Sequence, residues 1–363
     1  MKSNHQNQLS NIPVIAIVGA SFGWLSALLM LRKRLWNNVI IKLFDSRTQF
    51  THIPGLHDAI LNNEDTLTDM QIDLALHYPE YIHATVDRIE SNQLVSSDGS
   101  IHEFNYCVIA TGSRTKFPHD EASRQYAYTL NYACDVIKLN DILREPCTKR
   151  ITIIGGWYTG IEIASIIAQR KRTDQHITLI NTQSMFFPKL DRTTWTKVQK
   201  RFDDHDINTL HHSKVDTIQS DQLILSTGKI IKSDCHIVAR GIKVNDESFA
   251  SYLTFDDAYQ SKDHNHIYLC GDVAQHGLIA TAHNAMFEWR RMGNLIADHI
   301  QQITRSYPPL TNRDKLAIAL GQYDGIITIN SRWYYIPWLM GLVKKIIQWR
   351  VLIEFKYRVM LPV

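Results

Sequence analysis

The chain has 363 residues, of which 44% are hydrophobic and 21% are charged. Because a chain of this length exceeds what a single hydrophobic core usually supports, we expect two or three domains. The formal net charge of +3 argues against a nucleic-acid surface over the whole protein and leaves room for a local basic patch.

The N-terminus and the cysteines indicate a protein of a reducing compartment. Residues 1–12 are polar and lack the apolar centre of a secretory signal, so we expect a short disordered lead-in and a cytoplasmic protein. No stretch of 18 uninterrupted apolar residues is present, which argues against a transmembrane helix. The cysteines form no CxxC pair and have no zinc spacing, so we expect no metal site and buried structural thiols at Cys107, Cys134, Cys147, Cys235 and Cys270.

An internal repeat organises the chain. The stretch "IPVIAIVGASFGWLSALLMLRKR" predicts a buried strand, a turn at Gly19 and an apolar-periodic helix, and "VIIKLFD" predicts a second strand that ends at Asp45. The stretches "ITIIGGWYTGIEIASIIAQRK" and "HITLIN" repeat this order from Gly155 to Asn181. In both units the turn glycine and the strand end are 26 positions apart, which predicts two copies of a βαβ unit.

A second matched pair follows these units. The segments Asn92–Gly112 and Asp221–Gly241 align without a gap. Each predicts a hairpin, with turns at Gly99 and Gly228, and then a buried strand that ends at a glycine. A βαβ unit with an inserted β-meander is an arrangement that binds dinucleotides, with the pyrophosphate at a helix N-terminus.

These motifs, together with "VIATGS", "IYLCGDVA" and "TAHNAM", resemble the flavoproteins that have two dinucleotide-binding domains. Within that family the chain looks like the type II NADH dehydrogenases and the ferroptosis-suppressor-like quinone reductases. The resemblance implies an α/β fold with two Rossmann-like domains, as in glutathione reductase. It places an FAD domain at 13–118 and 262–310, an inserted NAD(P)H domain at 119–261 and a C-terminal membrane-associating region at 311–363.

The first glycine turn is expected to bind FAD. Its three positions are Gly19, Ser21 and Trp24; serine is small enough, whereas tryptophan is a departure for which the neighbouring Gly23 offers an alternative close approach. The carboxylate of Asp45 can accept both hydroxyls of the adenosine ribose. The resemblance assigns further FAD contacts to Phe22, Pro54, Thr85, Val86, Ala110, Thr111, Gly112, Gly271 and Asp272.

The second turn is expected to bind NADH or NADPH, with one departure. Gly155 and Gly160 match the first and third glycines, and the resemblance places the carboxylate of Glu162 near the nicotinamide, but Trp157 stands where the second glycine is needed. Either its indole rotates outward and Gly156 allows the close approach, or the turn keeps only its fold and no longer binds a dinucleotide.

The end of the second strand leaves the choice between the two donors open. Asn181 can hydrogen-bond a ribose hydroxyl and does not repel a 2′-phosphate. Lys171 and Arg172 are candidate phosphate partners, although a solvated helix end explains them better. Arg240 replaces Thr111 of the first copy; it either meets a phosphate or forms an ion pair.

The electron acceptor is expected to be a quinone. The resemblance places His283 opposite the quinone, where an imidazole could donate a proton; a structural helix histidine is the alternative, and Glu288 and His52 are further candidates. Without a cysteine pair, disulfide and sulfide substrates are not expected.

The C-terminal segment predicts a helix that lies in the headgroup region of a membrane. Lys344, Lys345 and Gln348 share one side of it, and Trp333, Tyr334, Tyr335 and Trp349 favour an interface. The apolar residues recur at helical spacing on another face, at Trp338, Leu339, Leu342, Val343, Ile346 and Ile347. Packing on the protein's own core or on a second subunit, as in a homodimer, is the alternative.

Three functions compete. The first is a peripheral-membrane NAD(P)H:quinone oxidoreductase with bound FAD. The second is an NAD(P)H-dependent reductase of a soluble redox protein, for which the C-terminal segment would be dispensable. The third is a flavoprotein that binds FAD and a membrane or partner but does not accept hydride.

Overall fold

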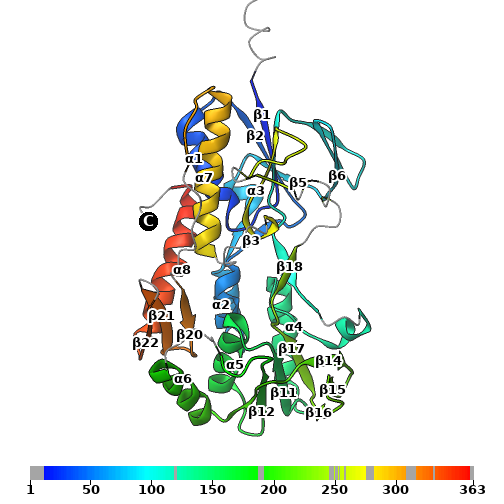
Figure 1. The fold of residues 1–363 in the computed structure, drawn as a ribbon, viewed down its shortest axis with the longest axis vertical. Helices are drawn as coiled ribbons and strands as arrows, with labels where there is room; N and C mark the ends of the chain where they lie inside the picture. The colour runs from blue at the N-terminus through cyan, green and yellow to red at the C-terminus, as the bar shows by residue number, and fades with distance from the viewer. Residues whose placement is uncertain are drawn as a thin grey trace, which may run out of the picture.

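The structure is a computed structural model that describes residues 12–117, 121–186, 192–244, 249, 252, 254–256, 259–274, 282–307, 316–329 and 332–359, with the backbone alone at 121, 282, 283, 328 and 329. Figure 1 shows two α/β units stacked along the long axis of the molecule. The first contains β1 and the second contains β11, so the predicted α/β fold with two Rossmann-like units is confirmed.

The first sheet has five parallel strands in the order β19-β9-β1-β2-β5. Because β19 comes from the last third of the chain, the first unit is discontinuous in sequence and the strands of the second sheet lie between its parts. Ile15 and Ile17 in the central strand are fully buried, as expected for a strand with neighbours on both sides. The strands are β1 (Val14–Val18), β2 (Ile40–Asp45), β5 (Tyr81–His83), β9 (Tyr106–Ile109) and β19 (Ile267–Leu269).

The second sheet repeats this order with four parallel strands, β13-β12-β11-β17. The registers are equivalent: Val18 pairs with Phe44 in the first sheet, and Ile154 pairs with Ile180 in the second. The predicted repeat is therefore present at the level of single residue pairs. The strands are β11 (Arg150–Ile154), β12 (His176–Ile180), β13 (Ile207–Leu210) and β17 (Cys235–Val238).

Each unit carries the predicted antiparallel meander. The turns lie at Gly99 and Gly228, with φ of +82° and +81°, a conformation that favours glycine. The meanders are β6 (Val86–Glu90), β7 (Gln93–Ser96) and β8 (Ile101–Glu103), and β14 (Val215–Ile218), β15 (Gln222–Leu225) and β16 (Ile230–Lys232). The smaller sheets are β3 (Gln49–Thr51) with β4 (Gln71–Asp73), β10 (Ser113–Thr115) with β18 (Ile242–Val244), and β20 (Ala317–Ala319), β21 (Gly325–Ile329) and β22 (Arg332–Ile336).

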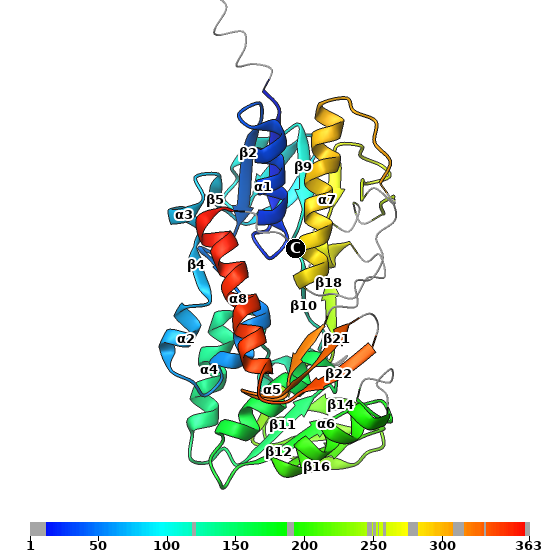
Figure 2. The same cartoon turned by 90° about the vertical axis from the view of Figure 1, so that its left-hand side faces the viewer.

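Two long helices pack side by side on the first sheet, α1 and α7 (Figure 2). Their close approach depends on Gly293, where a Cβ would lie 2.9 Å from the carbonyl oxygen of Ala27. The α-helices are α1 (Trp24–Leu35), α2 (Glu64–Thr68), α3 (Leu74–His77), α4 (Ala133–Arg144), α5 (Tyr158–Arg170), α6 (Arg192–Asp204), α7 (Ala282–Ile300) and α8 (Met340–Tyr357). Short 3-10 helices cover Ile53–Ala59, Glu121–Tyr126 and Gly271–Val273.

The helix α8 runs from the β20–β22 sheet, beside the second unit, to the first unit near α3 (Figure 2). Its C-terminal half belongs to the first core: Phe355 is fully buried and stacks on Phe50 with ring centroids 4.1 Å apart. The phenol of Tyr78 donates a hydrogen bond to the carbonyl of Phe355, and Arg358 pairs with Glu80 at 2.7 Å. The helix is therefore an integral part of the fold at this end.

The other half of α8 exposes apolar side chains. Leu342 is 56% exposed, and Ile346, Ile347 and Trp349 are exposed as well. The apolar face predicted from the sequence thus lies largely in solvent. Within the described part of the chain, no helix combines the length and the hydropathy needed to cross a membrane.

Replacing Phe355 with alanine tests how far α8 is part of the first core. We expect Phe355→Ala to lower the free energy of unfolding by about 3–5 kcal/mol, because a fully buried aromatic ring leaves a cavity. Leu342→Ala on the same helix is the matched control and should change it by no more than about 0.5 kcal/mol, since its side chain is exposed. Denaturant unfolding of both variants measures the difference, and equal effects would contradict this packing.

Candidate functional site

The first glycine turn joins β1 to α1 and requires glycine at its first position. Gly19 has a φ of +106°, and a Cβ there would lie 2.5 Å from the carbonyl oxygen of Ala110. Both the backbone conformation and this contact exclude a side chain. The third position differs from the motif because it holds Trp24 in place of a glycine. The Trp24 side chain is fully buried and packs on Tyr78. The space at Gly23 is filled by the indole of Trp289 from α7.

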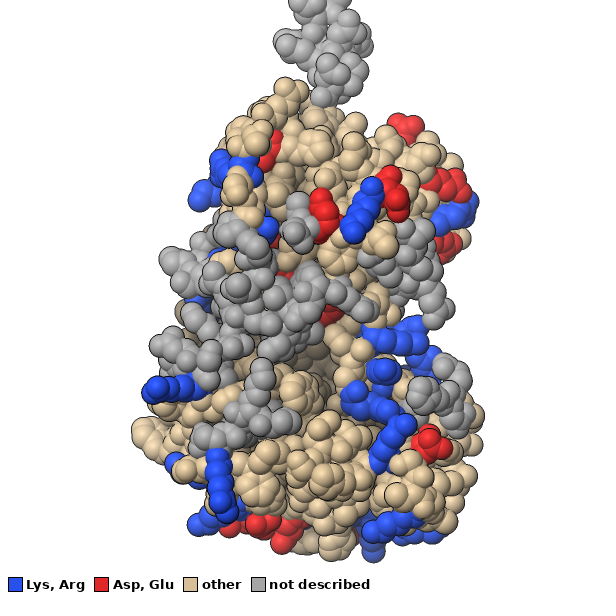
Figure 3. Space-filling model, in the orientation of Figure 1, with Lys and Arg blue, Asp and Glu red and all other residues tan. Residues whose placement is uncertain are grey.

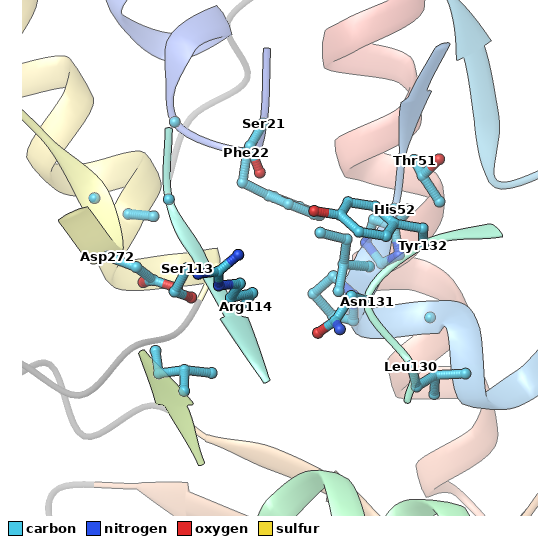
Figure 4. Close-up of a pocket in the computed structure, with 18 of the residues that line it drawn as sticks. Ser21, Phe22, Thr51, His52, Ser113, Arg114, Leu130, Asn131, Tyr132 and Asp272 are labelled. Atoms are coloured by element: carbon cyan, nitrogen blue, oxygen red, sulfur yellow. The ribbon is translucent and has the colours of Figure 1, made fainter. Parts of the chain in front are cut away.

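A cavity of about 1870 Å³ opens at this edge of the first sheet. It exceeds the roughly 300–1,000 Å³ of most small-molecule sites and has room for a dinucleotide. Figure 4 shows Ser113, Arg114 and Asp272 on one side of it and His52 and Tyr132 on the other. Every residue predicted to contact FAD lines this cavity: Gly19, Ser21, Phe22, Gly23, Asp45, Pro54, Thr85, Val86, Ala110, Thr111, Gly112, Gly271 and Asp272.

The residues of the cavity fit FAD. The hydroxyl of Thr111 is buried and finds no hydrogen-bond partner among the described residues, so it is available to a ligand at the pyrophosphate end of the turn. Two positions further along the chain, Ser113 donates to the carboxylate of Asp272 at 2.6 Å. Glu288 accepts a hydrogen bond from the backbone N–H of Gly271 at 3.1 Å and so orients this part of the cavity wall. The roles of the single residues toward FAD stay predictions.

Asp45 ends β2 as predicted, and its carboxylate is held by protein donors. It accepts hydrogen bonds from the backbone N–H of Ala20 at 2.6 Å and from the guanidinium of Arg47 at 2.7 and 2.9 Å. Burial raises the pKa of Asp45, but Arg47 and the backbone donors outweigh it and hold the pKa below its ordinary value. Arg47, which lies over the ring of Tyr132, was not identified from the sequence because nothing in its spacing marks it.

A charged cluster from three separate elements lies at the far end of the cavity. Glu162 of α5 forms an ion pair with Lys344 of α8 and accepts a hydrogen bond from the backbone N–H of Ala319 at 2.9 Å. The Nε2 atom of His57 lies 3.3 Å from Nζ of Lys344, and its Nδ1 atom lies 3.7 Å from Glu162. Burial, and then the charge of Lys344, lower the pKa of His57. Glu162, the predicted catalytic carboxylate, therefore lies beside the cavity with its charge neutralised by α8.

His52 adds a neutral imidazole to the same cavity wall. It is buried, its Nδ1 atom has no hydrogen-bond partner among the described residues, and its ring lies 5.1 Å from that of Phe22. Burial and the charge of Lys344 lower its pKa to about 3. His283, the other predicted catalytic residue, lies on α7 outside the part of the chain whose side chains are described.

The second turn keeps the glycines that the backbone needs. Gly155 has a φ of +124°, and a Cβ there would lie 2.3 Å from the carbonyl oxygen of Ala239; a Cβ at Gly160 would lie 1.8 Å from the carbonyl oxygen of Gly155. Trp157 has a φ of −101°, which any residue adopts, and its side chain is 46% exposed. The indole is therefore exposed and lines the edge of the FAD cavity. The first sequence alternative also has Gly156 allowing the close approach of the dinucleotide, and that part stays a prediction.

The end of β12 is a closed polar turn. The amide of Asn181 donates to the carbonyls of Gln183 and Met185 at 3.3 and 3.1 Å, and a Cβ at Gly156 would lie 2.6 Å from this amide group. Arg172 donates to the carbonyls of Leu143, Arg144, Glu145 and Thr148. This arginine therefore caps the C-terminal end of α4 and is not available to a phosphate. Gly155, Gly156, Gly160 and Asn181 do not line the large cavity.

The cysteines differ in part from the sequence expectation. Cys107, Cys235 and Cys270 are buried as expected, but Cys134 and Cys147 are exposed, so the prediction of five buried thiols is wrong for these two. Both lie on or just after α4, at solvent-facing positions. Cys134 and Cys270 line the cavity without forming a disulfide, and burial raises the pKa of Cys270 well above its ordinary value.

The neutral His52 predicts a loss of stability in acid. Between about pH 3 and the ordinary pKa of 6.5, the unfolded chain binds a proton at this position and the native protein does not. The free energy of unfolding should therefore fall as the pH drops below 6.5, with a contribution of up to about 1.4 kcal/mol per pH unit from this group. His52→Asn should flatten the slope in denaturant unfolding at a series of pH values, whereas His176→Asn, at an exposed position, should not.

The family model described as "Pyridine nucleotide-disulphide oxidoreductase" matches residues 13–288. The apoptosis-inducing factor homolog A of Dictyostelium discoideum is 21% identical over 375 residues, covering 91% of this chain and 88% of that protein.

Among solved structures, the sulfide:quinone oxidoreductase of Aquifex aeolicus has a TM-score of 0.82 at 16% identity and covers 96% of this chain and 93% of its own. NDH2 of Plasmodium falciparum, in complex with NADH, has a TM-score of 0.78 at 13% identity and covers 96% of both chains. The expected cofactors are confirmed: the protein binds FAD and uses NAD(P)H as its electron donor. The chain belongs to the pyridine nucleotide-disulphide oxidoreductase family.

Proposed function

We propose that this protein passes electrons from NAD(P)H, through bound FAD, to a quinone at a membrane surface, on the cytoplasmic side. The observation that carries the proposal is the position of α8. One side of this helix lines the FAD cavity with Val343, Lys344, Gln348 and Val351, while neighbouring apolar residues on the helix are exposed. An acceptor that dissolves in lipid would reach the cavity along this helix.

The exposed residues on and beside α8 suit a membrane surface. Trp338 is 74% exposed, and Trp349, Leu342 and Ile346 are exposed too, so a contiguous apolar surface is left without protein cover within the described residues. Tryptophan favours the boundary between headgroups and acyl chains. Lys345 is exposed beside them and can meet anionic headgroups.

The polar side of α8 supplies the chemistry. FAD would supply two-electron transfer at this site, from the hydride of NAD(P)H to the quinone. The quinol that forms carries two protons; the hydrogen of the transferred hydride accounts for one, and one further proton must be supplied. Lys344 is an ammonium with protons to donate, and it lies between His57 and Glu162 at the cavity wall. We infer that Lys344 delivers a proton to the reduced quinone and that Glu162 positions it. NAD(P)H as the donor is supported by the similarity to NDH2 of Plasmodium falciparum, whose structure is in complex with NADH. A quinone as the acceptor is supported by the similarity to the sulfide:quinone oxidoreductase of Aquifex aeolicus.

The membrane part of the proposal predicts a separable loss. We expect the double variant Leu342→Glu and Ile346→Glu to bind anionic vesicles at least roughly 10-fold more weakly, because two apolar side chains no longer enter the lipid. Its turnover with a long-chain quinone in those vesicles should fall with binding, while turnover with a short, water-soluble quinone should not. Vesicle sedimentation and quinone-dependent NAD(P)H oxidation measure the two effects.

Ile230→Glu is the matched control, since Ile230 is an exposed apolar residue on the meander of the second unit. It should change neither measurement. A double variant that keeps full activity with vesicle quinone would count against the membrane part of the proposal. A flavin that dithionite reduces without oxygen, but neither NADH nor NADPH does, would count against the electron-donor part.

The proton-donating role of Lys344 is tested against its neighbour. We expect Lys344→Gln to lower the rate of flavin reoxidation by quinone by about 10²-fold or more, as for the loss of a general acid. Lys345→Gln removes the same charge one position away, at an exposed site, and should leave the rate with a short, water-soluble quinone unchanged, because that quinone does not require the membrane surface. Stopped-flow measurement of the quinone half-reaction alone gives the comparison; equal rates for both variants would refute the role.

A further inference from the structure

Arg240 lies at the second glycine turn, between β17 and β18. A Cβ on Gly155 would lie 2.3 Å from the carbonyl oxygen of Ala239 and 2.9 Å from Cα of Arg240. The backbone of Arg240 therefore touches the same turn that precedes α5, the helix whose N-terminus faces a dinucleotide in such units.

The equivalent residue in the first unit indicates what Arg240 faces. A Cβ on Gly19 would lie 2.5 Å from the carbonyl oxygen of Ala110 and 3.2 Å from the backbone nitrogen of Thr111, so Thr111 is the counterpart of Arg240. Thr111 lines the dinucleotide cavity and has a buried hydroxyl without a partner among the described residues. Ala239 and Gly241, on either side of Arg240, line the large cavity, whereas Arg240 itself does not. By the symmetry of the repeat, Arg240 therefore stands beside this cavity at the second turn.

The charge of Arg240 is not neutralised by the described part of the protein. Its side chain is half-buried, and burial lowers the pKa of the guanidinium with no compensating carboxylate. Lys116 directly follows β10 and Lys243 lies in β18, the strand that pairs with β10, and no described acidic side chain pairs with either of them. Figure 3 shows Lys and Arg side chains gathered on this side of the molecule, over β18 and the strands below it. A half-buried cation of this kind favours an anionic ligand.

We propose that Arg240 binds the pyrophosphate of NAD(P)H at the second turn. A guanidinium offers paired donors that match phosphate oxygens, and it would supply from the β17 side a contact that complements the backbone N–H groups at the start of α5. The departure at Trp157 is thereby accommodated: the indole points outward, and an arginine absent from the first copy adds charge to the remaining donors.

The order of strands separates this role from recognition of a 2′-phosphate. In such units the adenosine ribose is bound at the end of the second strand, here Asn181 after β12. In the sheet, β11 lies between β12 and β17, so the strand that leads to Arg240 is about 10 Å away, two strand spacings. Arg240 should therefore serve NADH and NADPH equally. This inference rests on the donor site alone and does not depend on which acceptor the protein uses.

The test measures binding rather than turnover. Full-length, FAD-loaded protein is titrated in a calorimeter with ADP-ribose, with 2′-phospho-ADP-ribose and with adenosine, for the wild type and for Arg240→Gln, Arg240→Lys and Lys229→Gln. Lys229 is an exposed lysine of the meander hairpin and is the control for a general loss of positive charge. Flavin absorbance of each sample confirms that the first unit is intact.

We expect Arg240→Gln to weaken ADP-ribose and its 2′-phospho form by the same factor, roughly 10- to 100-fold, as for a lost hydrogen bond to a charged group. Adenosine should be unaffected, Arg240→Lys should restore part of the affinity, and Lys229→Gln should match the wild type. An effect confined to the 2′-phospho form would overturn the assignment to the pyrophosphate. Unchanged affinity in Arg240→Gln, or a wild type that binds no ADP-ribose, would overturn the proposal.

Discussion

Both halves of this molecule depend on one close contact between a turn and a neighbouring strand. At Gly19 and again at Gly155, the backbone passes so near a carbonyl at the end of the adjacent strand that a Cβ would come within 2.5 and 2.3 Å of it. The contact fixes the angle at which α1 and α5 leave their sheets, and it sets both helix N-termini beside the strand ends where ligands of such units bind. Both sites therefore depend on glycine, which has no Cβ, at these two positions.

The two units share this backbone arrangement but differ in the side chains around the glycine turn. Around the first, Asp45, Thr111 and Asp272 line a deep cavity. Around the second, the strand end closes on itself through Asn181, the indole of Trp157 faces outward, and charge is supplied by Arg240. A cofactor that stays bound suits the deep first cavity, and a substrate that must enter and leave suits the second turn, whose glycines lie outside that cavity.

Much of this arrangement could be predicted because repeated local patterns carry it. The spacing of the turn glycines predicted both parallel sheets, and Gly99 and Gly228 marked both hairpins. The cluster at the far end of the cavity could not be predicted in this way: Glu162 and Lys344 are 182 positions apart, and no periodicity links an acid on one helix to a base on another. The sequence placed Lys344, Lys345 and Gln348 on one side of the last helix, but only Lys344 and Gln348 line the cavity, together with the apolar Val343 and Ile347, whereas Lys345 is exposed. Which side meets the cavity depends on packing. The exposure of the Trp157 side chain likewise depends on the packing around it, which a motif does not reveal.

The placement of α8 has a mechanical consequence. Its first turns are held by the ion pair with Glu162 in the second unit, and its last turns by Phe355 and Arg358 in the first. An 18-residue α-helix is a rod of about 27 Å that neither stretches nor shortens appreciably. The pairing of β10 with β18 is one connection between the two units, and α8 is a second. The two units can therefore tilt about the line through these two connections but cannot move apart. A lipid surface that grips this rod would therefore also restrict the tilt, and attachment and electron transfer would share one moving part.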